Sequence, residues 1–257
     1  MKKIFYILVI LSLAVISCKK TPDPARADFE MQVSGDPEVG KEISFINKSQ
    51  NAVSFDWDFG DGYASQDENP FYTYNSTGTF TVRLTVKGEN GDESSATLTV
   101  DVKIPTLLVV EVVEYYDEYV VPGAEVRLYE SLVDWNAAND KWVYLGLTDD
   151  SGISVFSNLG PYVYYVDAYK GYNTPSGYDN YTLAEEDQDF ITVPTVIPNK
   201  INWFTAWVDV ADHSGTKGSS RSREFVVKKL EKRSDKEVMH KLGTDGWQEL
   251  YEKSLRK

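Results

Sequence analysis

Hydrophobic and polar residues alternate along most of residues 28–103, which predicts short β-strands with one buried face. In the clearest run, Val53, Phe55, Trp57 and Phe59 share one side of a strand, and the residues between them are polar. The same alternation is found in Phe29–Val33, Ile43–Phe45, Phe80–Val86 and Ala96–Val102. Turn-forming residues separate these runs, so the segment is typical of a β-sandwich.

Residues 105–210 contain a second series of strand patterns. Leu107 to Val113 is an almost continuous apolar run, and Pro122 to Tyr129 alternates. Further candidate strands are Trp142–Leu147, Ile153–Val155, Val163–Ala168 and Trp203–Val208, with a turn at Thr148–Gly152. We therefore predict an all-β fold of two tandem sandwiches, Ig-like or transthyretin-like in shape.

Residues 211–257 differ from the rest of the chain. Residues 211–222 predict a flexible, mildly basic linker. Ser234 and Glu237 have the spacing of a capping box, and Gly243 can end the helix that follows. Another helical stripe consists of Trp247, Leu250, Tyr251 and Leu255. The helical tail can dock on the second sandwich, bind a partner or lie on a membrane surface, and the sequence leaves these roles open.

Residues 28–103 resemble a PKD domain, an Ig-like sandwich. The resemblance is carried by Trp-Asp-Phe-Gly-Asp-Gly at 57–62 and by Asn69-Pro70, Tyr74, Gly78 and 80–86. Tyr72 stands where the family often has histidine. We expect Trp57 to fill the space between the sheets, and Gly60 and Gly62 to allow a tight turn with positive φ.

Residues 105–210 resemble carboxypeptidase regulatory-like and collagen-adhesin B-type repeats, which are transthyretin-like sandwiches. The similar segments are Pro122–Leu128, Thr148–Gly152, Phe156–Leu159 and Tyr164–Val166. Some adhesin repeats form a Lys–Asn isopeptide bond from a lysine in the first strand. Residues 106–114 contain no lysine, so we do not expect that crosslink.

Residues 1–17 have the features of an export signal, because a basic start precedes an apolar run of 13 residues from Ile4 to Ile16. As a helix this run spans about 20 Å, less than the roughly 30 Å of a bilayer core. The end of the run, Val-Ile-Ser-Cys at 15–18, resembles a bacterial lipobox, in which the cysteine is acylated, for example with palmitate. The alternative is an ordinary signal peptide followed by an unrelated cysteine.

The expected mature chain begins at Cys18 and continues through a polar tether, residues 18–27. Cys18 is the only cysteine, so no intrachain disulfide can form. We expect a lipid-anchored protein of the cell envelope at the outer membrane, with the periplasmic or surface side left open.

The chain is strongly acidic, which argues against a nucleic-acid partner because phosphates would be repelled. Its formal charge is −14, and removal of Lys2 and Lys3 takes it to −16. Residues 211–257 are opposite in sign, with 12 lysines and arginines against 8 acids.

The sequence has no pattern typical of an active site, such as a Gly-x-Ser-x-Gly elbow, a phosphate-cradling loop or a His-rich metal motif. No cofactor is expected, and a weak calcium site at Asp56, Asp58 and Asp61 is the one metal candidate. The alternative is that these acids form the turn and are otherwise solvated.

Four aromatic residues fall in turn-like sequence and are candidates for exposed binding residues. They are Trp135, Tyr172, Tyr178 and Tyr181. Exposed rings can stack on sugars or anchor a protein partner, whereas packing is the alternative role.

Together these features predict a non-enzymatic lipoprotein that acts as a spacer and recognition module for a protein or a glycan. The competing hypothesis is a structural subunit of a larger envelope assembly, docked through its basic C-terminal tail.

Overall fold

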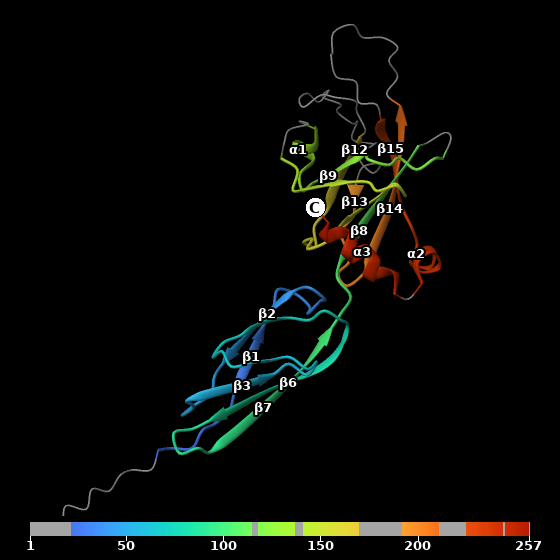
Figure 1. Ribbon diagram of the computed structural model, residues 1–257. Coiled ribbons are helices and arrows are strands. Elements are labelled where there is room, and N and C mark those ends of the chain that lie inside the picture. The colour runs from blue at the N-terminus through green and yellow to red at the C-terminus, as the bar shows by residue number, and fades with distance from the viewer. Residues whose placement is uncertain are drawn as a thin grey trace, which may run out of the picture. The chain divides into compact units, whose positions relative to one another are not determined.

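The computed structural model in Figure 1 describes residues 22–114, 118–136, 141–169, 192–210, 225–243 and 245–256. Residue contacts divide these residues into two compact units. The first comprises residues 22–32, 44–71 and 80–99, and the second comprises the other described residues. Each unit is built mainly from β-sheets, as the alternating sequence pattern predicts.

The N-terminal strands form a sandwich of two sheets. They are β1 (Phe29–Gln32), β2 (Glu42–Asn47), β3 (Ser54–Asp58), β4 (Ala64–Ser65), β5 (Phe71–Thr73), β6 (Gly78–Lys87) and β7 (Glu93–Val102). One sheet has the order β1-β2-β5 and the other has the order β4-β3-β6-β7. Val82, Leu84 and Val86 of β6 are fully buried, which confirms the predicted alternation there.

Trp57 lies at the centre of this sandwich, as expected. It is fully buried, and its indole Nε1 donates a hydrogen bond to the Asp67 carbonyl oxygen at 2.9 Å. Its ring centroid lies 5.0 Å from that of Phe29 and 5.8 Å from that of Phe45. The prediction that Val53 shares this buried face is wrong, because β3 begins only at Ser54 and Val53 is 59% exposed.

The C-terminal strands form two further sheets. They are β8 (Leu107–Glu114), β9 (Glu125–Tyr129), β10 (Tyr144–Leu147), β11 (Ile153–Phe156), β12 (Tyr164–Tyr169), β13 (Thr192–Val193), β14 (Ile201–Val210) and β15 (Phe225–Lys232). The sheet orders are β11-β8-β14-β15 and β10-β9-β12-β13. Strands β8 and β14 run parallel, whereas the other registered pairs of these sheets run antiparallel.

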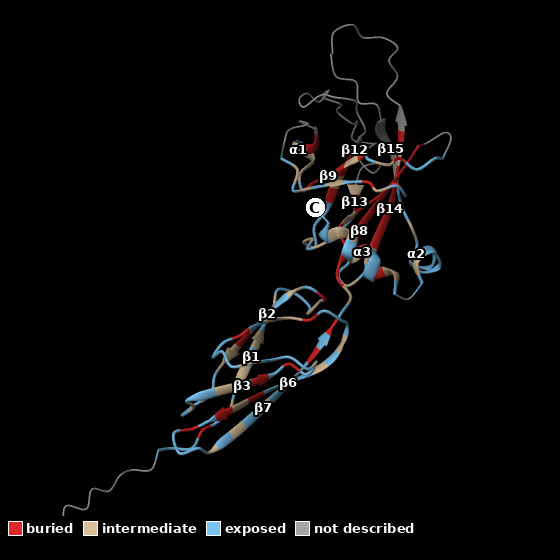
Figure 2. Cartoon of the chain, in the orientation of Figure 1, coloured by how far each residue is buried: buried red, intermediate tan, exposed pale blue. Residues whose placement is uncertain are grey.

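Strand β8 is buried on both faces, and Figure 2 shows it and β14 largely in red. Its even-numbered side chains, Leu108, Val110 and Val112, enter the core between the two sheets. Its odd-numbered side chains point to the other face, so that face also needs a covering layer.

Two C-terminal helices supply that layer. Helices α2 (Asp235–Leu242) and α3 (Gly246–Leu255) place Val238 and Leu250 against Leu107, Val109 and Trp203 of the sheet. Of the three roles left open for the tail, the structure therefore shows docking on the second sandwich. Leu255 does not take part in this contact and is 56% exposed.

The predicted helical tail is confirmed, and the structure adds a strand between the linker and the first of its helices. Residues Phe225–Lys232 form β15, which pairs antiparallel with β14 at the edge of the sheet. The strand has the sequence FVVKKLEK, in which apolar and charged residues are grouped in neighbouring positions instead of alternating, so the pattern did not reveal it. The capping box is confirmed, since Ser234 and Glu237 exchange both hydrogen bonds at the start of α2. The predicted linker, 211–222, lies outside the described residues.

Within the part of the chain that the structure describes, no helix is long and apolar enough to cross a membrane. The short helix α1 (Leu132–Asn136) packs near β9 and β12.

The position of Trp57 predicts a large loss of stability on truncation. Trp57→Ala should lower the free energy of unfolding of the first sandwich by about 3–5 kcal/mol, because it leaves a cavity among Phe29 and Phe45. Urea denaturation followed by circular dichroism measures this change. Val53→Ala is the matched control and should change stability by less than about 0.5 kcal/mol. Equal effects of the two substitutions would contradict the assigned core.

Candidate functional site

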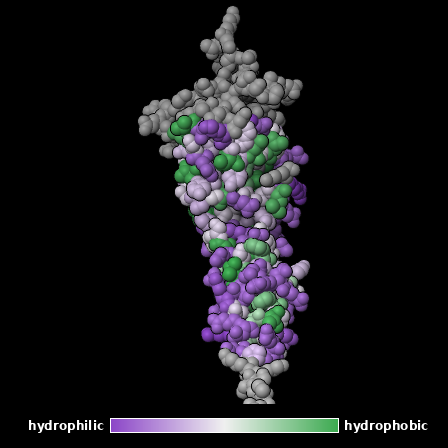
Figure 3. Space-filling model, turned by 90° about the vertical axis from the view of Figure 1, so that its left-hand side faces the viewer, coloured by the Kyte–Doolittle hydropathy of each residue, from purple (hydrophilic) through white to green (hydrophobic). Residues whose placement is uncertain are grey.

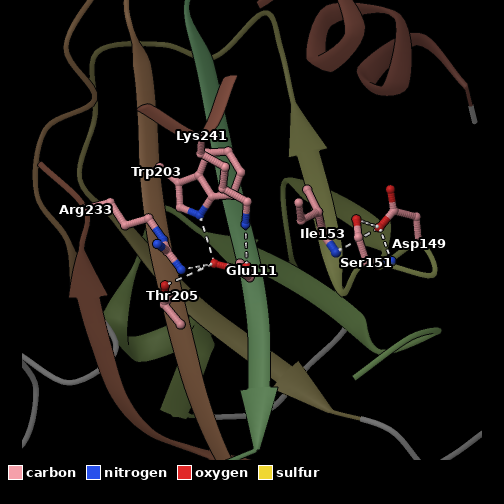
Figure 4. A network of polar contacts seen from close by, with 8 residues as sticks. All are labelled: Glu111, Asp149, Ser151, Ile153, Trp203, Thr205, Arg233 and Lys241. Carbon is pink, nitrogen blue, oxygen red and sulfur yellow. Dashed lines mark hydrogen bonds and ion pairs between the residues drawn. The ribbon is translucent and has the colours of Figure 1, made fainter. Parts of the chain in front are cut away.

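The most elaborate polar site among the described residues surrounds Glu111, in the middle of β8. Its side chain is only 6% exposed. Figure 4 shows Arg233 and Lys241 reaching the carboxylate from the C-terminal segment. Arg233 Nη2 lies 2.6 Å from Oε2, and Lys241 Nζ lies 2.9 Å from Oε1.

Two residues of β14 also donate hydrogen bonds to this carboxylate. Trp203 Nε1 donates to Oε2 at 3.3 Å, and the Thr205 hydroxyl donates to the same oxygen at 3.4 Å. Both residues face Glu111 because β8 and β14 are paired in parallel register, with Thr205 directly opposite. Lys241 Nζ also lies 4.7 Å from the centroid of the Trp203 ring.

The electrostatics of this site keep the carboxylate ionised. Burial by itself would raise the pKa of Glu111, but the hydrogen bonds and charges of Lys241 and Arg233 outweigh it and lower the pKa. A carboxyl group held this way is a poor proton donor near neutral pH. Its donors are also supplied by the protein itself, so the arrangement anchors the C-terminal segment to the sheet rather than serving as an acid catalyst.

A second ion pair fastens α3 to the turn between β10 and β11. Lys253 Nζ lies 2.7 Å from Asp149 Oδ2, while Asp149 Oδ1 accepts hydrogen bonds from the backbone N–H groups of Ser151 and Ile153. Burial opposes ionisation of Asp149, but Lys253 and the turn donors prevail and lower its pKa to about 2. The predicted turn at Thr148–Gly152 is thus also an attachment point for α3.

The acidic turn after Trp57 is organised by short-range hydrogen bonds. Asp58 Oδ1 accepts from the Gly60 N–H at 2.9 Å, and Asp61 Oδ1 accepts from the Tyr63 N–H at 3.3 Å. Gly60 has a φ of 83°, and a Cβ there would lie 2.7 Å from the Thr81 carbonyl oxygen. These contacts are the turn-forming role that the sequence analysis weighed against calcium binding.

The residues that the structure describes include no group of three or more His, Cys, Asp or Glu side chains that could hold a metal ion. A weak calcium site at Asp56, Asp58 and Asp61 stays a prediction.

The prediction that Trp135 is exposed is wrong. Trp135 is 6% exposed, and its Nε1 donates to the Val166 carbonyl oxygen at 3.0 Å. It lies in α1 and packs with Tyr129 and Tyr165, so its ring is used for packing. Turn-like sequence does not reveal this burial, because the contacts with Tyr165 and Val166 come from β12, which is remote in the sequence.

The other predicted site residues cannot be placed in the same way. Cys18, Tyr172, Tyr178 and Tyr181 all lie outside the described residues. Their roles in lipidation and binding stay predictions.

Sequence reasoning missed the buried charges of the second unit, which among the described residues are Glu111, Glu114, Arg127 and Asp167. Glu111 is the one acid inside the apolar run Leu107–Val113, and that isolation is the signal that could have found it. Arg127 in β9 is also buried. It pairs with Glu125 at 2.7 Å and lies 4.4 Å from the Trp142 ring centroid.

Comparison with known proteins identifies the N-terminal sandwich. A family model described as PKD domain matches residues 19–104. This segment is a PKD domain. The match confirms the family predicted from the Trp-Asp-Phe-Gly-Asp-Gly motif.

Curated relatives carry the PKD domain within much longer proteins. Collagenase ColA of Bacillus cereus is 44% identical over 70 residues, which cover 25% of this chain and 7% of ColA. Pre-pro-metalloprotease PrtV of Vibrio cholerae is 34% identical over 82 residues, which cover 32% of this chain and 9% of PrtV. The chain thus matches less than a tenth of either relative.

A solved structure covers the same region. The PKD1 domain of Vibrio cholerae PrtV is 32% identical, covers 31% of this chain and 98% of that domain, and has a TM-score of 0.28. PKD domains are non-catalytic modules, and these relatives contain them as parts of proteases. The matched part of this chain is therefore a non-catalytic module.

Removing the charge of Glu111 should loosen the C-terminal segment. Glu111→Gln should lower the free energy of unfolding by about 1.5–3 kcal/mol, because it weakens two charge-assisted hydrogen bonds to Arg233 and Lys241. Urea denaturation followed by tryptophan fluorescence reports the change, since Trp203 lies beside the site. Glu249→Gln is the control and should cost at most about 0.5 kcal/mol, because Glu249 is exposed and has only an i,i+4 pair with Lys253. If both variants behaved alike, Glu111 would not be an anchor.

The pair between Asp149 and Lys253 predicts a measurable titration. Since the folded pKa of Asp149 is about 2, below its ordinary 3.8, the pair stabilises the fold above about pH 4 and loses this effect as the pH falls toward 2. Lys253→Gln should raise the pKa of Asp149 toward 3.8, as followed by the carboxyl ¹³C chemical shift in NMR. Arg256→Gln should leave it unchanged, because among the described residues Arg256 pairs with Glu252 and not with Asp149. An unchanged Asp149 pKa in Lys253→Gln would refute the pairing.

Proposed function

We propose that this protein is a non-enzymatic lipoprotein of the cell envelope, anchored at the outer membrane through a lipid on Cys18. Its two sandwiches serve as a spacer and as a recognition surface for a protein or a glycan.

The position of Cys18 supports the anchor most directly. It follows a basic start and an apolar run from Ile4 to Ile16, and it is the only cysteine of the chain. A cysteine at the end of such a segment is suited to acylation. Two or more acyl chains give stable membrane attachment, whereas one gives only marginal binding.

Glu111 and Asp149 are both engaged in ion pairs that hold the C-terminal segment, which supports a binding role for the protein over a catalytic one. Glu111 is held by Arg233 and Lys241, and Asp149 by Lys253. The PKD domain is a non-catalytic module. Figure 3 shows small groups of hydrophobic side chains among hydrophilic ones, a surface compatible with soluble recognition modules. The formal charge of −14 disfavours nucleic acid as the ligand.

The alternative of an assembly subunit docked through its C-terminal tail has less support. Val238 and Leu250 are buried against the second sandwich, and Arg233 and Lys241 are paired with Glu111. Docking through these residues would first require the tail to leave its own sheet. We therefore favour recognition by the surface of the sandwiches.

Cell fractionation tests the anchor. The native protein should sediment with membranes and show acyl mass on its N-terminal peptide, whereas Cys18→Ser should be released and carry none. Thr21→Ser, three residues further on, is the control and should behave like the native protein. A Cys18→Ser variant that stays equally bound to membranes would contradict the proposal.

Affinity purification from native membranes tests the recognition function, which predicts that a protein or glycan partner co-purifies reproducibly.

A further inference from the structure

Three tyrosines of the second sandwich, Tyr144, Tyr162 and Tyr164, lie near one another, and the ring of Tyr162 is exposed. Tyr162 lies just before β12 and is 56% exposed. Its N–H donates to the Gly160 carbonyl oxygen at 2.8 Å, and its own carbonyl accepts from the Val196 N–H at 3.3 Å. The backbone of Tyr162 is therefore held from two sides.

Gly160 gives this ring a defined position. A Cβ built on Gly160 would lie 2.3 Å from Cε2 and 2.6 Å from Cδ2 of Tyr162. The ring therefore lies directly over the glycine, and any larger residue at position 160 would displace it. An exposed aromatic ring that already lies against a neighbouring residue loses less conformational entropy when a ligand stacks on it than a ring without such a contact.

Two tyrosine hydroxyls bind the backbone of the segment that contains Gly160. Tyr144 donates its hydroxyl proton to the Asn158 carbonyl oxygen at 2.9 Å, and Tyr164 donates its proton to that of Gly160 at 3.2 Å. The rings of Tyr144 and Tyr164 meet edge to face, with centroids 6.0 Å apart. Tyr164 is fully buried, so it supports the cluster, whereas Tyr144 is half-buried and can accept a hydrogen bond from a ligand.

Two exposed residues belong to the same part of the fold: Asn158, whose carbonyl oxygen accepts from Tyr144, and Glu130, whose charge acts on Tyr144 and Tyr164. Asn158 carries an amide with donors and an acceptor, and Glu130 carries a carboxylate. Burial raises the pKa of Tyr144 and Tyr164, and the nearby charge of Glu130 raises both further. The hydroxyls therefore stay protonated, and the charge of Glu130 disfavours an anionic ligand.

We infer that this tyrosine cluster (Tyr162, Tyr144, Asn158 and Glu130, supported by Gly160 and Tyr164) is a binding site for a neutral saccharide. A sugar presents C–H groups that pack on the negative face of an aromatic ring, together with hydroxyls that both donate and accept. The cluster offers this combination of one exposed ring with several polar groups. A protein hot spot needs instead a desolvated apolar pocket, so the saccharide is favoured. The inference rests on the proposed recognition function and names its ligand class.

Affinity electrophoresis of the full-length protein in gels containing neutral polysaccharides tests the site. Laminarin, xylan, mannan, dextran and hydroxyethyl cellulose are the probes, and at least one should retard the native protein. Tyr162→Ala should weaken that binding at least about tenfold, equivalent to about 1.4 kcal/mol. Gly160→Ala should also weaken it, because the ring remains present but is displaced. A merely structural effect is excluded by thermal unfolding of each variant.

Tyr119→Ala is the matched control, since Tyr119 is also an exposed tyrosine of the second unit. It should bind like the native protein. The inference is overturned if none of the polysaccharides retards the native protein, or if Tyr162→Ala binds as well as Tyr119→Ala. It is also overturned if Tyr162→Ala loses a protein partner but no saccharide. A partner that still co-purifies from membranes in these cases would leave the proposed recognition function standing.

Discussion

The second sandwich depends on the parallel pairing of β8 with β14, which is buried on both sides. One face of the pair belongs to the core between the sheets, and the other is covered by α2 and α3. A strand buried in this way leaves no solvated face for a charged side chain. Glu111 is nevertheless placed there, and its carboxylate is tolerated because cations from the C-terminal segment reach it. Packing of the C-terminal segment on the sheet therefore also brings Arg233 and Lys241 to the Glu111 carboxylate.

The same constraint explains why the C-terminal segment belongs to the second sandwich. Its apolar residues alone would give a loosely specified contact, since hydrophobic burial has no direction. Arg233 and Lys241 add direction, because both must reach one carboxylate. Lys253 fixes α3 at a second point, on Asp149. Ion pairs at two carboxylates, Glu111 and Asp149, and one apolar patch thus define where the helices lie.

Much of the fold could be predicted from local pattern. Alternation gave the strands around Trp57 and in β6, and the spacing of Ser234 and Glu237 gave the start of α2. The continuous apolar run Leu107–Val113 also carried information that alternation does not, because such runs are typical of strands covered on both faces. Local pattern failed for β15, a charged strand that pairs with β14 at the edge of the described sheet. It also failed for Trp135, whose burial is decided by Tyr129 and Tyr165.

The site was less predictable than the fold, for a physical reason. Glu111 and its partners Arg233 and Lys241 are separated by 122 and 130 residues, so no short motif records their meeting. Turn chemistry was legible at Asp58 and Asp61, since those hydrogen bonds span two residues. The tyrosine cluster is intermediate, because Gly160, Tyr162 and Tyr164 are neighbours in sequence but Tyr144 is not.

The long separation between β8 and the segment that covers it has a kinetic consequence. Contacts between remote residues must overcome the entropy of closing a long loop before they are rewarded, so domains rich in them fold slowly. Until β15, α2 and α3 have packed on the β11-β8-β14-β15 sheet, one face of that sheet stays exposed to solvent, including its apolar side chains. An intermediate of this kind is prone to self-association, and a chain crossing a membrane before it folds would need a chaperone to shield that side.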